Sequence, residues 1–135
     1  MDAALPPPLD DLLEAWNDWD VERAVALMHP EVEIRGLRAA LENTTYRGRE
    51  EARRFFADVR ESWVSAAAEV REVEVFGDRV AASLVLRLRA RETRMEFERT
   101  VGTLYELDDG LVRAWITYFD ATGAGEIAAI HSAGA

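Results

Sequence analysis

Two side chains that can stabilise negative charge fall on one predicted strand in the C-terminal half of the chain. Arg99 and Tyr105 share one side of the stretch 95–107, because side chains an even number of residues apart along a strand point to the same face. A guanidinium and a phenol both donate hydrogen bonds to a carbonyl oxygen that gains negative charge during a reaction. We therefore predict Arg99 and Tyr105 as candidate catalytic residues.

Each of these two residues also has a structural interpretation. An inward-facing arginine needs a partner, and a helix could supply Glu14 or Asp18. Alternatively, Arg99 lines a wet pocket and binds a carbonyl, phenolate or carboxylate. Tyr105 could equally pack in the core and find one hydrogen-bond partner.

Other kinds of chemistry are excluded by the composition. The chain has no cysteine, and all sixteen basic residues are arginine, which removes thiolate nucleophiles, cysteine-bound metals and lysine Schiff bases. Its two histidines, His29 and His131, are too few for a histidine-rich metal site. We expect no metal and no cofactor.

Length and charge indicate a small acidic globular protein. The chain has 135 residues, of which 49% are hydrophobic, enough to form the core of one domain. A net charge of −10 argues against binding to nucleic acid or to an anionic membrane surface. The segment Met1–Asp10 lacks the features of a signal peptide, so a cytoplasmic protein is expected.

Helical and strand patterns divide the chain into two halves. Leu9, Leu12 and Trp16 mark an amphipathic helix, Asp20 is a candidate N-cap for a second, and a third follows Gly48. Alternation or turn signals predict strands at 31–35, 69–76, 80–91, 95–107 and 111–120. This order predicts an α+β fold with helices packed on an antiparallel sheet. We expect one domain over 1–135, with a core at 9–120 and a flexible tail or short helix at 121–135.

Charge pairing predicts which side of the sheet faces the helices. An even-length loop at 92–95 places Arg89 opposite Glu98 and Arg91 opposite Glu96, which leaves a charged outer row and an apolar inner face. The same register places Leu86 beside Val101. The predicted pocket residues combine this inner face with the helical stripes: Trp16, Phe56, Leu86, Phe97, Val101, Thr103, Trp115, Thr117 and Phe119.

The outer face has its own apolar residues, which suggest an interface. We expect a homodimer formed through this face, because a two-fold pair is the commonest oligomer. The patch comprises Gly102, Leu104, Val112, Ala114, Ile116 and Tyr118.

Several short motifs, taken in order, resemble a known superfamily. They are Tyr46–Ala52 leading into Phe55-Phe56, Gly77–Val80, Tyr105–Val112, and Trp115 followed by Tyr118–Asp120. Together they resemble the SnoaL-like branch of the nuclear-transport-factor-2-like fold, which includes ketosteroid isomerase, small polyketide cyclases and limonene epoxide hydrolase. The resemblance covers roughly residues 9 to 120. It implies a curved sheet wrapped around the N-terminal helices, like a cystatin-type α+β barrel, with a cone-shaped pocket for an apolar small molecule.

The acid and base positions of those enzymes do not match this chain. The isomerase positions fall at Leu12, near Gly36 and at Thr103, and the last-strand acid of the hydrolase and cyclases falls at Thr117. A base from Glu42, in the connection 37–47, remains open. The resemblance implies a small-molecule-binding protein, as a polyketide cyclase- or isomerase-type enzyme acting on an apolar carbonyl compound. The alternative is a non-catalytic ligand-binding or dimerisation module of the same fold.

Overall fold

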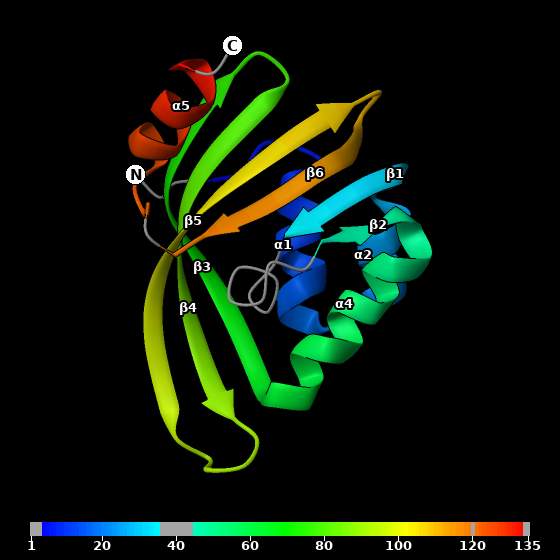
Figure 1. The fold of residues 1–135 in the computed structure, drawn as a ribbon, viewed down its shortest axis with the longest axis vertical. Coiled ribbons are helices and arrows are strands. Elements are labelled where there is room, and N and C mark those ends of the chain that lie inside the picture. Colours follow the sequence, from blue (N-terminus) through cyan, green and yellow to red (C-terminus); the bar gives the residue numbers. More distant parts are fainter. Residues whose placement is uncertain (1–3, 36–44, 120, 134–135) are drawn as a thin grey trace.

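A computed structural model describes residues 4–35, 45–119 and 121–133, and shows the predicted α+β architecture (Figure 1). Glu42 and Asp120 lie outside the described residues. The helices are α1 (Leu9–Asp18), α2 (Val21–Ala26), α4 (Gly48–Ser62) and α5 (Ala124–Ala133). The strands are β1 (Met28–Arg35), β2 (Tyr46–Arg47), β3 (Trp63–Phe76), β4 (Arg79–Ala90), β5 (Glu96–Asp108) and β6 (Leu111–Tyr118). No helix in these ranges is long and apolar enough to cross a membrane.

The six strands form one curved sheet in the order β2-β1-β6-β5-β4-β3. The four long strands make the expected antiparallel meander, but β1 pairs with β6 in parallel. Parallel neighbours need a long connection between them, and here that connection contains β2, α4 and the strands β3 to β5. A pattern read along each strand separately does not reveal such a pairing, so the sequence predicted no partner for β1.

The outer row of arginines and glutamates forms as predicted, with a shifted register. Arg87 pairs with Glu98 and Arg89 with Glu96, whereas the expected partners of Glu98 and Glu96 were Arg89 and Arg91. The shift is two residues. Because side chains alternate with a period of two, each residue stays on its predicted face.

The loop between β4 and β5 explains the shift. The Ala90 N–H donates to the Met95 carbonyl at 2.9 Å, so the four-residue loop begins one residue earlier than expected. No glycine, proline or asparagine marks its position in the sequence. Between β5 and β6, Thr103 lies opposite Thr117.

The main core lies between the inner face of the sheet and helices α1, α2 and α4 (Figure 1). Helix α2 begins at the predicted cap, where Asp20 accepts a hydrogen bond from the Arg23 N–H at 3.2 Å. The apolar stripes of the two longer helices are buried as expected. These stripes comprise Leu9, Leu12, Ala15 and Trp16 on α1, and Ala52, Phe55, Phe56 and Val59 on α4.

The C-terminal residues form the short helix α5, which packs on the outer face of the sheet (Figure 1). Ile127 is fully buried in a second apolar cluster with Ala81 and Leu104. A Cβ on Gly102 would lie 2.8 Å from the Ile127 side chain, so α5 touches the sheet backbone there. The centre of the predicted dimer patch is therefore covered by the chain's own helix.

Val112, which was predicted to belong to that patch, does not lie on the outer face. A register shift between β5 and β6 occurs at Glu106/Leu107, and beyond it Val112 turns into the main core. An extra residue in one strand reverses the facing of the residues that follow, which explains the wrong assignment of Val112 to the outer face.

Candidate functional site

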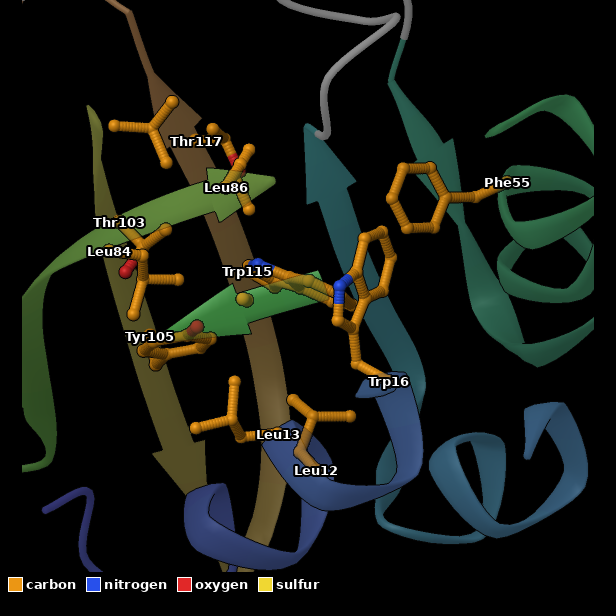
Figure 2. A pocket seen from close by; sticks show the side chains of 12 residues that line it. Leu12, Leu13, Trp16, Phe55, Leu84, Leu86, Thr103, Tyr105, Trp115 and Thr117 are labelled. Carbon is orange, nitrogen blue, oxygen red and sulfur yellow. The ribbon is translucent and has the colours of Figure 1, made fainter. Parts of the chain in front are cut away.

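A cavity lies between α1, α4 and the inner face of the sheet (Figure 2). The space that the centre of a water molecule can occupy inside it is about 30 Å³, which is room for water-sized groups. Its walls are mostly aliphatic and aromatic. The lining residues are Leu12, Leu13, Trp16, Phe55, Ala68, Leu84, Leu86, Val101, Thr103, Tyr105, Trp115 and Thr117.

Packed aromatic rings hold two indoles in this wall. The rings of Trp16 and Trp115 lie 5.6 Å apart at 81°, and Phe55 lies 5.4 Å from Trp115 at 78°. Such edge-to-face contacts fix ring orientation and stabilise the cluster. Tyr105 continues it, with its ring 6.2 Å from Trp115. The direction of each indole N–H is therefore set by the surrounding packing.

Both indole N–H groups are buried without a protein acceptor. Trp16 is 5% exposed and Trp115 is 7% exposed, and neither Nε1 atom has a hydrogen-bond partner. Buried polar groups are normally hydrogen-bonded, and an unsatisfied donor costs about 1–3 kcal/mol. An indole nitrogen can only donate. Two residues of the cavity wall thus carry desolvated donors that no protein group satisfies.

Tyr105 and Thr103 add hydroxyl groups to the same wall. Burial raises the pKa of Tyr105 to about 12, although a side-chain hydrogen bond with Thr103 works in the opposite direction. The phenol is therefore neutral at physiological pH and can donate its proton in a hydrogen bond. The Thr103 hydroxyl donates to the Ala82 carbonyl at 3.3 Å, which orients it within the sheet.

No carboxylate, histidine or arginine is among the described residues that line the cavity. Thr103 and Thr117 occupy the positions where the resemblance would place catalytic acids. No group of acidic or histidine side chains able to hold a metal ion occurs within residues 4–35, 45–119 and 121–133. This wall can orient a ligand and donate hydrogen bonds, but it offers no proton acceptor of carboxylate type.

Most of the predicted pocket is brought together in the structure. The predicted residues found in the wall are Trp16, Leu86, Val101, Thr103, Tyr105, Trp115 and Thr117. Phe56 lies behind the wall, 5.8 Å from Trp16 and 6.3 Å from Trp115, and does not line the cavity. Five further residues line the cavity and were not predicted to do so: Leu12, Leu13, Phe55, Ala68 and Leu84. Periodicity in the sequence indicates which side chains face inward, but it does not distinguish a cavity wall from the core.

Besides Phe56, three predicted residues do not line the cavity, namely Phe97, Arg99 and Phe119. Arg99 is exposed, and its guanidinium lies over the Phe119 ring at 4.4 Å. Phe97 is 44% exposed and packs against Trp63 at 6.1 Å. The inner face extends past the helices along β5, so correct facing does not guarantee enclosure (Figure 1). Arg99 and Tyr105 are about 20 Å apart along the strand, too far to stabilise the same oxyanion.

The helical acids suggested for Arg99 are engaged elsewhere. Glu14 and Asp18 both pair with Arg23, at 3.4 and 3.9 Å. Among the residues that the structure describes, Arg99 has no salt-bridge partner. The structural interpretation of Arg99 as the partner of a helical acid is therefore wrong.

Comparison with known proteins defines the class. The SnoaL-like domain model matches residues 9–115, so the chain belongs to the SnoaL-like domain family. No curated protein matches the sequence.

Three solved structures illustrate the shared fold. An NTF2-like protein of unknown function from Burkholderia pseudomallei has 17% identity, covers 88% of this chain and 90% of its own, and superposes with a TM-score of 0.74. A Catenulispora acidiphila protein with a ketosteroid isomerase-like fold, in complex with trimethylamine, has 16% identity, coverages of 85% and 87%, and a TM-score of 0.75. The epoxide hydrolase/cyclase-like enzyme SalBIII has 15% identity, coverages of 82% and 86%, and a TM-score of 0.71. At these identities the likeness shows the fold.

Proposed function

We propose that this protein binds a compact apolar molecule that carries a hydrogen-bond acceptor, such as a ketone carbonyl. The cavity in this conformation has room only for water-sized groups, so in this proposal side chains of the wall move aside when the ligand enters. The observation that carries the proposal is the pair of buried indole N–H groups of Trp16 and Trp115, which have no protein acceptor. The aliphatic and aromatic wall favours an apolar body. The donors favour an acceptor atom, because they are already removed from water and gain a bond without further desolvation.

A second candidate function is catalysis of the isomerase or polyketide cyclase type on such a carbonyl compound. The neutral Tyr105 phenol supports it, because a buried donor can stabilise the enolate oxygen formed when a proton leaves the neighbouring carbon. The described wall contains no base for that proton, which favours the non-catalytic alternative. Hydrogen–deuterium exchange at the methyl group of acetophenone, followed by NMR, separates the two: accelerated exchange indicates catalysis.

A matched ligand pair tests the binding proposal. Acetophenone and α-methylstyrene have nearly the same shape, but only the ketone has an acceptor oxygen. We expect acetophenone to bind about tenfold more tightly in an NMR titration, which corresponds to one net hydrogen bond. Trp115→Phe and Trp16→Phe should reduce this preference while α-methylstyrene still binds.

Trp19→Phe is the control, because Trp19 packs beside Trp16 at 5.3 Å and is not part of the wall. It should leave the preference unchanged. Equal affinities for the two ligands in the unmodified protein, or a preference that survives both wall substitutions, would contradict the proposal.

A further inference from the structure

The inner face of β5 continues from the cavity to an arginine on the open part of the sheet. Val101 lines the cavity, and Arg99 is the next residue along β5 with the same facing. The cross-strand partner of Arg99 is Leu86, which also lines the cavity. Arg99 therefore borders the cavity wall without being enclosed by it.

Among the arginines of β4, β5 and β6, Arg99 is the one that pairs with no carboxylate of the described residues. Four strand arginines each have an acidic partner, and the pairs are Arg79–Glu106, Arg87–Glu69, Arg89–Glu96 and Arg113–Asp108. Within the described ranges no acid pairs with Arg99. Its positive charge is thus available to an anion that approaches along the inner face.

Aromatic residues hold that charge in place. The Arg99 guanidinium lies over the Phe119 ring at 4.4 Å, a stacking that arginine adopts while its edge donors stay free. Trp63 and Phe97 form a second aromatic pair on the same open part of the sheet. A planar guanidinium with one face covered is suited to binding a carboxylate through two parallel hydrogen bonds.

We propose that Arg99 forms an anion-binding subsite at the border of the cavity, so that the ligand is an amphipathic carboxylate whose apolar body occupies the cavity. This inference rests on the proposed binding function and adds the charge and length of the ligand. Trp115, which carries one of the two indole donors, lies opposite Tyr105, and Tyr105 is six residues, about 20 Å, from Arg99 along β5. The ligand is therefore elongated, with its carboxylate and its acceptor at opposite ends.

The test uses 4-acetylcinnamate and its neutral amide, 4-acetylcinnamamide. Both carry the acetophenone group for the cavity, and only the acid carries a distal carboxylate. We expect the acid to bind the unmodified protein about tenfold or more tightly than the amide, as for a charge-assisted hydrogen bond. Arg99→Met and Arg99→Gln should abolish this difference without changing the affinity for the amide.

Arg87→Met is the matched control, because Arg87 lies on the outer face of the same hairpin and pairs with Glu69 at 3.0 Å. It should preserve the preference for the acid. If the amide binds and the acid binds no better, the anion subsite is overturned and the proposed function stands. If neither compound binds, both are overturned. A preference for the acid that survives both Arg99 substitutions overturns the assignment to Arg99.

Discussion

Burial determines what Tyr105 contributes to the cavity. A phenol in water loses its proton near pH 10, whereas the buried Tyr105 side chain has a pKa of about 12 because the charged form is poorly solvated. Across the physiological range it therefore remains a neutral donor, like the indoles of Trp16 and Trp115. The cavity wall thus contains three donor side chains whose charge does not change across this pH range.

This shift predicts how stability depends on alkaline pH. Below pH 10 both the folded and the unfolded chain keep the Tyr105 proton, so the residue adds no pH dependence there. Between about pH 10 and 12 the unfolded chain binds fewer protons, and the free energy of unfolding falls by about 2 to 3 kcal/mol. Tyr105→Phe should remove this part of the decrease, measured by urea denaturation at pH 9 and at pH 11.5.

Tyrosinate absorbance supplies the control. The chain has three tyrosines, and the component lost in Tyr105→Phe should titrate with a pKa of about 12. The same alkaline decrease in stability in both proteins would contradict the assignment.

For single residues, the period-two alternation along a strand correctly predicted which face of the sheet a side chain lies on. It did not predict which of these side chains line the cavity. Val101, Thr103 and Tyr105 line the cavity as expected, but Phe97 and Arg99, on the same face, lie outside it. Whether a side chain of β5 is covered depends on how far α1 and α4 extend over the sheet. The sequence of β5 does not contain that information. The missing acceptors of the two indoles are likewise a three-dimensional property, because every neighbouring element must be in place before a donor can be called unpaired.

At the level of the elements, Asn17 joins the end of α1 to the edge strand β3. Its side-chain amide donates to the Ala68 carbonyl at 3.0 Å and its oxygen accepts from the Ala68 N–H at 2.8 Å. Ala68 is also part of the cavity wall. An edge strand exposes unpaired backbone groups, and here one side chain satisfies both groups of a residue in the middle of that edge.

Replacing Asn17 should therefore weaken the attachment of α1 to the sheet. We expect Asn17→Ala to lower the free energy of unfolding by about 1 to 2 kcal/mol, because two hydrogen bonds are lost at an exposed position. Urea denaturation measures this change. Asp18→Ala is the control, because the Asp18 carboxylate lies 3.9 Å from the Arg23 guanidinium, a long and exposed ion pair. Its removal should lower the free energy of unfolding by less than about 0.5 kcal/mol. Equal effects of the two substitutions would show that the Ala68 contact contributes nothing.

Element boundaries were predicted best where the local signal was strong. The Asp20 cap of α2 lies where expected, and so does the turn between the predicted strands 95–107 and 111–120. Strand β3, by contrast, begins at Trp63, six residues before the predicted Glu69. The intervening alanine-rich stretch has little strand propensity of its own, and pairing with the end of β4 keeps it extended.

For the whole molecule, the sheet separates two different surfaces. Its inner face holds the cavity, while its outer face carries α5 (Figure 1). The Glu72 carboxylate accepts from the Ala124 N–H at 3.1 Å, and the Tyr118 hydroxyl lies 2.7 Å from His131 Nε2. These contacts hold both ends of α5. A homodimer through the outer face stays a proposal. Such a dimer would either form through the residues that α5 leaves uncovered or require α5 to move away from the sheet.

Undocking α5 tests whether it shields the outer face from self-association. Ile127→Asp introduces a charge into a fully buried position, which should release the helix and expose Ala81 and Leu104. We expect light scattering to show a molar mass that rises with concentration more steeply than in the unmodified protein. Hydrogen exchange over residues 124–133 verifies the release. Ile130→Asp is the matched control, because Ile130 is 47% exposed on the same helix. A released helix with the same mass as the control would show that the uncovered face does not associate.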